Sequence, residues 1–233
     1  MWNDKKKAIT FSFDDGVVQD IRLIEILNKY NLKATFNLNS AKLGLPSEPW
    51  KLTDGREIPR LILPVSKIKE LYKGHEIAVH TLTHPNLTTL DDETVIRQVD
   101  LDRKMLSEIC GYPVIGMAYP CGGVNNDERV AALIKNNTPI AYARTITSTL
   151  TFELQKDNLL RFNPTLHYMN EKTEEIVEKF LNLDADEPQL LYIWGHSYEL
   201  DYDESRWVRF ENLCKMLSGK EDIFYGTNKE VLL

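Results

Sequence analysis

The sequence lacks the features that mark several classes of protein. No apolar run approaches the roughly 18 residues that cross a bilayer, and no apolar segment follows the lysines near the N-terminus as in an export signal. The 28 Lys and Arg are outnumbered by 35 Asp and Glu, giving a net charge of −7, so the basic face of a nucleic-acid-binding protein is not expected. The sequence predicts a cytoplasmic protein, or one whose export signal was removed, without membrane or nucleic-acid partners; it makes no prediction of oligomeric state.

Cysteine is also scarce, and the chain has no internal repeat, low-complexity tract or linker. Three cysteines are too few, and odd in number, for a disulfide framework, so free thiols are expected. Hydrophobic residues at 42% and charged residues at 27% are ordinary for globular proteins. A chain of 233 residues can bury roughly 70% of its unfolded surface. We therefore expect a single domain over residues 1–233 that needs neither disulfides nor metal to fold.

Short apolar segments alternate with amphipathic ones along the chain. Apolar patterns predict strands over Lys7–Phe13, Lys33–Leu38, His75–His80, Val114–Tyr119, Ile140–Thr145 and Leu190–Gly195. Helical spacing predicts helices over Ser66–Lys73, Asn126–Lys135, Glu171–Leu183, Ser205–Leu217, a long segment starting at Asp91, and a first helix up to Tyr30 with Val17, Ile21, Ile24 and Leu27 on one face. Repeated alternation of this kind indicates an α/β fold with a mostly parallel sheet, either open or closed into a barrel.

Residues 39–64 interrupt this alternation. Four prolines and the turn signal Thr53-Asp54-Gly55 predict an irregular insertion, with a hairpin, that flanks a site.

Two adjacent carboxylates, Asp14 and Asp15, follow the first strand and precede Gly16. Neighbouring carboxylates repel each other unless they share a cation or a proton. Gly16 allows the chain to turn so that both side chains face one site. Taken alone, Asp-Asp-Gly is more typical of a plain turn or a helix cap than of a catalytic pair.

His80 and His84 lie four residues apart at the end of the third strand. Pro85 disfavours helical geometry at His84, so the pair is predicted to lie in a loop. Loop histidines at this spacing either chelate one metal ion, usually Zn²⁺, or are ordinary polar residues. His75, at the other end of the strand, is predicted to be structural.

Two further strands end in polar groups. The segment 116–123 runs from a strand into a Pro-Cys-Gly-Gly turn, where glycine lets backbone N–H groups approach a substrate oxygen. His196 follows the apolar strand Leu190–Gly195. Because α/β folds place active sites at strand ends, these groups are expected to belong to one site.

In this order the motifs resemble those of the polysaccharide deacetylases, carbohydrate esterase family four, with a NodB-like homology domain. The resemblance implies a distorted (β/α) barrel, with seven strands rather than a full eight. It also implies one divalent metal ion, Zn²⁺ or alternatively Co²⁺ or Ni²⁺, held by Asp15, His80 and His84. Asp14 would be the general base and His196 the general acid of a hydrolase that removes acetyl groups from an N-acetylated or O-acetylated saccharide.

The family's third motif normally carries an arginine two residues before its proline, and Ala118 occupies that position here. We expect Arg144, at the end of the next strand, to supply the positive charge beside Asp14. The backbone N–H of Cys121 is the predicted oxyanion donor. Saccharide contacts are predicted for Tyr119, Pro120 and Trp194, and Trp50 is a further aromatic candidate.

The family's Asp-x-x-Asp-Trp motif, whose acid tunes the late histidine, is absent, and the segment 161–167 takes roughly its place. Glu199 and Asp201 are both candidate partners of His196. His167 is either a residue of the pocket or a solvated loop histidine.

Other interpretations follow from the same residues. Two histidines and one carboxylate also suit non-haem Fe(II) oxygenases, but an oxygenase has no use for an adjacent base and an opposed acid. A same-fold hydrolase of another non-peptide C–N bond, such as a cyclic ureide, is an alternative, and the full ligand set argues against its metal-free form. An inactive carbohydrate-binding module is the third possibility, and the presence of Asp14 and His196 argues against it. Since no export signal is visible, a soluble intracellular saccharide is the expected substrate.

Overall fold

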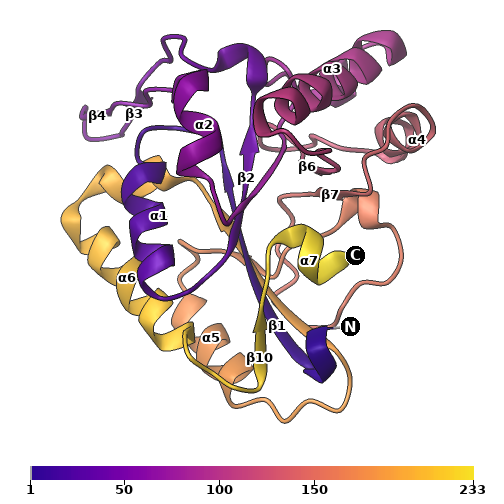
Figure 1. Ribbon diagram of the computed structural model, residues 1–233. Helices are drawn as coiled ribbons and strands as arrows, with labels where there is room; N and C mark the ends of the chain where they lie inside the picture. The colour runs from indigo at the N-terminus through magenta and orange to yellow at the C-terminus, as the bar shows by residue number, and fades with distance from the viewer. Residues whose placement is uncertain (1) are drawn as a thin grey trace.

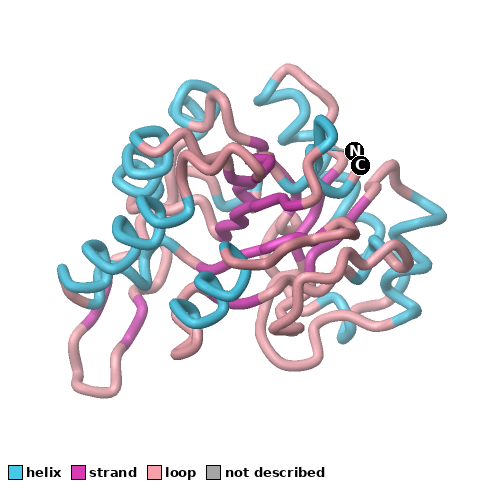
Figure 2. The backbone as a smooth tube through the Cα atoms, turned by 90° about the horizontal axis from the view of Figure 1, so that it is seen from below, coloured by secondary structure: helices cyan, strands magenta, loops and turns pink. Residues whose placement is uncertain are grey.

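The computed structural model describes residues 2–233 and consists of a curled parallel sheet surrounded by helices (Figures 1 and 2). The strands are β1 (Lys7–Asp14), β2 (Ala34–Leu38), β3 (Trp50–Lys51), β4 (Glu57–Ile58), β5 (Glu76–Val79), β6 (Gly116–Ala118), β7 (Tyr142–Arg144), β8 (Leu166–His167), β9 (Gln189–Gly195) and β10 (Ile223–Tyr225). The helices are α1 (Asp20–Lys29), α2 (Val65–Leu71), α3 (Asp92–Cys110), α4 (Glu128–Asn137), α5 (Thr173–Leu181), α6 (Glu204–Leu217) and α7 (Asn228–Leu232). Among residues 2–233, no helix combines the length and the apolar composition needed to cross a bilayer.

The sheet has β1 near its centre. Parallel strands follow the order β7-β6-β5-β2-β1-β9-β8, and β10 pairs with the first residues of β1. Phe162, just before β8, joins the two edges: its N–H donates to Ala143 O at 2.9 Å, and its carbonyl accepts from Thr145 N–H at 2.8 Å. The expected distorted seven-stranded barrel is therefore confirmed.

Every residue of β1 is buried, and the alternation along the strand separates two environments. Ile9, Phe11 and Phe13 belong to the hydrophobic core. Within that core the ring of Phe13 lies 5.8 Å from that of Phe210 in α6, edge to face. Thr10, Ser12 and Asp14 alternate with these residues and enter hydrogen bonds inside the barrel, so β1 combines an apolar outer face with a polar inner one.

The polar interior continues below Asp14. Ser12 Oγ accepts hydrogen bonds from Asn37 Nδ2 at 2.9 Å, Arg144 Nε at 3.2 Å and Asn228 Nδ2 at 3.2 Å. Asn228 Oδ1 accepts from Thr10 Oγ1 at 2.9 Å. Asn228 is the first residue of α7, so this short helix covers the end of the barrel opposite the carboxyl ends of the strands.

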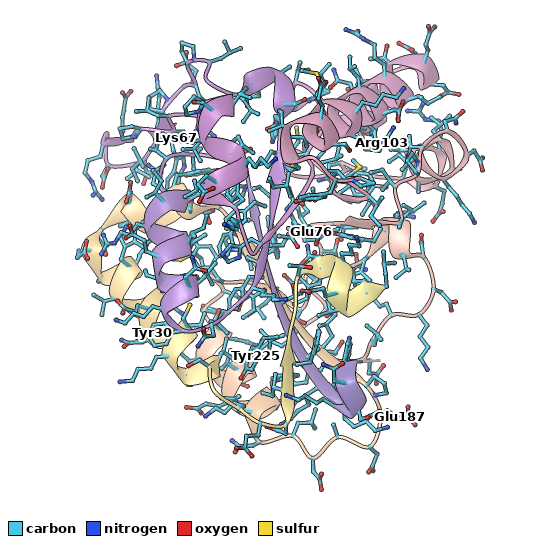
Figure 3. All side chains as sticks on the ribbon, viewed as in Figure 1. Tyr30, Lys67, Glu76, Arg103, Glu187 and Tyr225 are labelled. Carbon is cyan, nitrogen blue, oxygen red and sulfur yellow. The ribbon has the colours of Figure 1, made fainter. Side chains whose placement is uncertain are left out.

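Glu76 lies at the start of β5 beside α7 (Figure 3). Its carboxylate accepts from Thr35 Oγ1 at 2.7 Å, Tyr142 Oη at 2.9 Å and Lys229 N–H at 2.9 Å. Burial raises the pKa of Glu76, although these hydrogen bonds oppose the change. The buried carboxyl thus joins three strands to the cap.

The structure corrects the sequence prediction at α1. The helix begins at Asp20, and Val17 lies in the preceding loop, bridged to Ile62. Ile21 is 44% exposed, whereas Leu23 and Ile26 are buried beside the expected Ile24 and Leu27. The apolar face of α1 is therefore rotated relative to the pattern that included Val17.

Among the strands and α-helices, three were not predicted: β8, β10 and α7. They contain two, three and five residues, which is too short for a periodic hydrophobic pattern.

Candidate active site

The ends of β1, β5, β6 and β9 contribute to the wall of a cavity of about 260 Å³. Asp14, Asp15, His80, His84 and His196 all line it. The strand-end groups singled out in the sequence therefore do come together.

Backbone geometry turns Asp15 toward the cavity. Asp15 has φ of +81° and Gly16 has φ of +65°, both in the left-handed region. A Cβ at Gly16 would lie 2.7 Å from Leu38 Cδ2, so only glycine fits there without displacing Leu38. The turn depends on a left-handed Asp15 as well as on the glycine anticipated from the sequence.

The loop after β5 presents the two histidines. His80 Nδ1 is 2.9 Å from the carbonyl of Ala118, which fixes Nδ1 as the donor and leaves Nε2 free to accept. Thr81 and His84 both have positive φ. Asn39 Nδ2 holds the loop by donating to the carbonyls of His80 at 2.5 Å and Thr81 at 2.8 Å.

Asp15, His80 and His84 form a compact donor set. Asp15 Oδ1 lies 3.9 Å from His80 Nε2 and 3.5 Å from His84 Nε2. The oxygen is buried and accepts no hydrogen bond within residues 2–233. Burial lowers the pKa of both histidines, that of His84 to about 4, so both are neutral at pH 7. An unpaired carboxylate oxygen facing two neutral imidazoles is the donor set of a divalent metal site, and these residues fit such an ion.

Asp14 faces a buried cation. Arg144 Nη2 donates to both carboxylate oxygens, at 2.6 and 2.5 Å, and both side chains are almost completely buried. Burial alone would raise the pKa of Asp14, but Arg144, with smaller contributions from His80 and His196, lowers it to about 2. Arg144 thus lies beside Asp14 and supplies the positive charge expected there, since Ala118 occupies the position of the usual motif arginine.

Glu199 lies between two imidazoles. Its Oε1 is 3.4 Å from His196 Nδ1, and its Oε2 is 3.2 Å from His167 Nε2. Met169 N–H donates to His167 Nδ1 at 3.2 Å, so His167 presents Nε2–H to Glu199. Burial would lower the pKa of His196, but Glu199 outweighs it and the pKa rises to about 9. His196 is therefore protonated at pH 7, with Nε2 3.9 Å from Asp14 Oδ2.

Asp201, the other candidate partner of His196, is engaged elsewhere. Its oxygens accept from Gln19 Nε2 at 2.8 Å and Trp207 Nε1 at 2.9 Å. The 3₁₀ helix η5 (Ser197–Tyr202) explains this difference, because Glu199 folds back onto the backbone N–H of His196 in a capping box.

Not all of the other residues predicted to contact the substrate line the cavity. Cys121 lines the cavity with φ of +69°, and its Sγ lies 3.8 Å from His84 Nδ1. Trp194 also lines the cavity, and its ring centroid lies 4.5 Å from the central carbon of the Arg144 guanidinium. Tyr119 contributes to the wall but is buried, with its hydroxyl donating to Leu160 O at 2.7 Å. Pro120 does not line the cavity. Trp50 packs against Tyr198 at 5.7 Å between ring centroids.

Sequence reasoning missed a buried acid beneath the histidine loop. Asp102 of α3 accepts from Ser40 N–H at 2.7 Å and His80 N–H at 3.2 Å, and burial raises its pKa to about 7. An acid on the apolar face of α3, three residues after Val99, was the available signal.

A family model described as polysaccharide deacetylase matches residues 2–138, more than half of the chain. The chain belongs to the polysaccharide deacetylase family. The match includes Asp14, Asp15, His80 and His84 and ends before His196.

Relatives within the deacetylase family are distant. The peptidoglycan-N-acetylmuramic acid deacetylase PdaC of Bacillus subtilis is 25% identical over 126 residues, which are 53% of this chain and 23% of that protein. The chain thus matches about a quarter of that relative's length. A solved structure of a putative polysaccharide deacetylase from Mycobacterium smegmatis has a TM-score of 0.67 at 17% identity, covering 100% of this chain and 91% of the other.

A CE4 family pseudoenzyme from Bacillus anthracis has a TM-score of 0.53 at 16% identity, covering 99% of this chain and 66% of the other. Likeness at this level concerns the fold alone. Activity has to be argued from the side chains in the cavity.

Proposed function

We propose that this protein is a metal-dependent hydrolase that removes acetyl groups from an N-acetylated or O-acetylated saccharide. The observation that carries the proposal is the joint presence, in one cavity, of the Asp15–His80–His84 donor set, an ionised Asp14 and a protonated His196. Family membership and relatives named as deacetylases of peptidoglycan and chitin support it.

Asp15, His80 and His84 would hold the divalent ion, for which we propose Zn²⁺ because neutral imidazoles and one carboxylate suit it. When bound, the ion supplies a Lewis acid toward the acetyl carbonyl and a water molecule. The protein need not reorganise its ligands for this, since hydrogen bonds from Asn39 and to Ala118 already fix the loop and the His80 ring.

Asp14 is the proposed general base that accepts a proton from the attacking water. Its low pKa keeps it ionised, and Arg144 fixes the orientation of both oxygens. The backbone N–H of Cys121 is the proposed donor to the developing oxyanion; left-handed backbone at this position turns the chain at the cavity wall.

His196 is the proposed general acid. Protonation at Nδ1 is stabilised by Glu199, so the imidazolium presents Nε2–H on the Asp14 side of the cavity. This proton would go to the departing amine or alcohol, which cannot leave readily as an anion.

The test is acetate release from chitin oligosaccharides and acetylated xylan by the Zn²⁺-loaded protein. Asp14→Asn should reduce the rate by about 10²-fold or more, within the range for general-base catalysis. Asp184→Asn, in the exposed loop after α5, is the matched control and should leave the rate unchanged. Release of no acetate from any acetylated saccharide, or full activity of Asp14→Asn, would refute the proposal.

A further inference from the structure

Arg60 lines the active-site cavity and is the one lysine or arginine that does so within residues 2–233. It comes from the segment 39–64, directly after the β3–β4 hairpin, which projects from the body of the protein in Figures 1 and 2. Arg60 is half-buried, and no carboxylate in the described chain forms an ion pair with it. Nearby Arg56, by contrast, is exposed and pairs with Asp54 at 2.8 Å. The cavity therefore contains an unpaired guanidinium.

The backbone that carries Arg60 is fixed to the loop that carries Asp15. Val18 N–H donates to Leu61 O at 2.8 Å, and Leu63 N–H donates to Gly16 O at 2.9 Å. Gln19 Nε2 adds a hydrogen bond to Pro59 O at 2.7 Å. Arg60 is thus held in register with the candidate metal site rather than carried on a free loop.

The guanidinium itself is oriented. Arg60 Nε donates to Glu48 O at 3.0 Å, and the guanidinium also acts on the Tyr198 hydroxyl, where it opposes the rise in pKa that burial causes. Its central carbon lies 5.2 Å from the ring centroid of Tyr198, and that ring lies 5.1 Å from the ring of His196. Arg60 and His196 therefore lie beside the same tyrosine ring in the cavity wall.

The electrostatics of the cavity favour an anion at this place. Asp14 is paired with Arg144, and His196 with Glu199. Asp15, the divalent ion of the proposed function and Arg60 remain, and their sum is positive in a protein whose net charge is −7. A positive pocket attracts anionic ligands, whereas the net negative charge of the rest of the protein repels them.

We propose that Arg60 forms an anion subsite of the same cavity, and that the substrate is an acetylated saccharide bearing a carboxylate or phosphate. This inference rests on the proposed deacetylase function. A planar guanidinium suits two-point contact with either group.

The test compares acetate release from three sugars by the Zn²⁺-loaded protein: N-acetylglucosamine, N-acetylmuramic acid and N-acetylglucosamine 6-phosphate. We expect a higher kcat/KM for at least one anionic sugar, and the favoured sugar identifies the anion. Arg60→Gln should lower that kcat/KM about 10- to 100-fold, mainly through KM, and lower kcat/KM for the neutral sugar much less. Arg60→Lys should restore part of the loss, and the advantage should shrink as salt is added. Arg56→Gln is the matched control and should alter neither activity.

Binding provides a readout that does not depend on turnover. Muramic acid and glucosamine lack the acetyl group, so calorimetric titration measures their affinity without turnover. Muramic acid should bind more tightly than glucosamine; if phosphate is the anion, glucosamine 6-phosphate should do so instead. Arg60→Gln should abolish this difference in affinity. Equal kcat/KM for neutral and anionic sugars, or equal losses on both in Arg60→Gln, would overturn the anion subsite while the deacetylase function stands. Absence of acetate release from all acetylated sugars would overturn the deacetylase function and this inference with it.

Discussion

Replacing Glu199 by glutamine should shift the pH dependence of deacetylation. The carboxylate of Glu199 faces His196 Nδ1 at 3.4 Å and is the leading reason why the pKa of His196 rises from 6.5 to about 9. That shift corresponds to about 3 kcal/mol in favour of the imidazolium. Without the charge, the pKa should fall to about 6.5 or below, since burial opposes protonation.

The magnitude follows from the protonated fraction of His196. At pH 7.5 almost all of the wild-type imidazole is protonated, but at a pKa of 6.5 only about a tenth would be. In Glu199→Gln, kcat/KM on an N-acetyl sugar should therefore fall about tenfold at pH 7.5, and the alkaline limb of the profile should move from near pH 9 to near pH 6.5.

The assay is the pH profile of kcat/KM for acetate release. Asp201→Asn is the control, because Asp201 bonds to Gln19 and Trp207 instead of His196, and its profile should match the wild type. An aryl acetate, whose phenolate leaves without a proton, should show no corresponding shift in Glu199→Gln. An alkaline limb that stays near pH 9 in this variant would refute the assignment of Glu199 as the group that keeps His196 protonated.

Three further predictions concern single histidines. His84→Ala should lose the bound Zn²⁺ and the activity while retaining the circular dichroism of the wild type, because the hydrophobic core lies elsewhere; metal retained at full stoichiometry would contradict this. His196→Ala should reduce hydrolysis of an N-acetyl sugar about 10²-fold and that of an aryl acetate far less, because Asp14 remains, and equal losses would reject the acid role. His75 accepts Ala34 N–H through Nδ1 at 3.1 Å, and burial lowers its pKa to about 4. In the unfolded chain the pKa of His75 is near 6.5, so protonation of this histidine favours unfolding. The free energy of unfolding should therefore fall by up to about 3 kcal/mol from pH 6.5 to 4. Urea denaturation of His75→Gln should lack this pH-dependent loss.

The chemistry of the site was largely readable from the sequence because its residues stand next to strand ends. Asp14, Asp15, His80 and His196 each follow an apolar strand, and parallel strands bring such positions to one edge. Arg144 was accessible for the same reason. The sequence could not decide whether Glu199 or Asp201 is the partner of His196, because this depends on how η5 turns. Residues two apart in a 3₁₀ helix point in different directions.

The buried polar floor of the barrel was less accessible. Alternation in β1 predicts a strand, but it does not say that Thr10 and Ser12 face an enclosed interior rather than solvent. Partners for these residues come from Asn228 and Asn37, distant in sequence, and short elements such as α7 give no periodic signal. Arg60 was missed because only the pairing of residues 59–63 with the Asp15 loop brings it to the cavity.

The cap formed by α7 has a consequence for the order in which the chain folds. Asn228 bonds to Ser12 and Thr10, which precede it by 216 and 218 positions. During synthesis β1 leaves the ribosome before α7 is made, so Ser12 and Thr10 lack their Asn228 partner until α7 has also emerged. Contacts of such long sequence separation slow folding, because a large loop must close before they form. The hydrogen bonds around Ser12, which also accepts from Arg144, are thus complete only after the segment around Asn228 has docked.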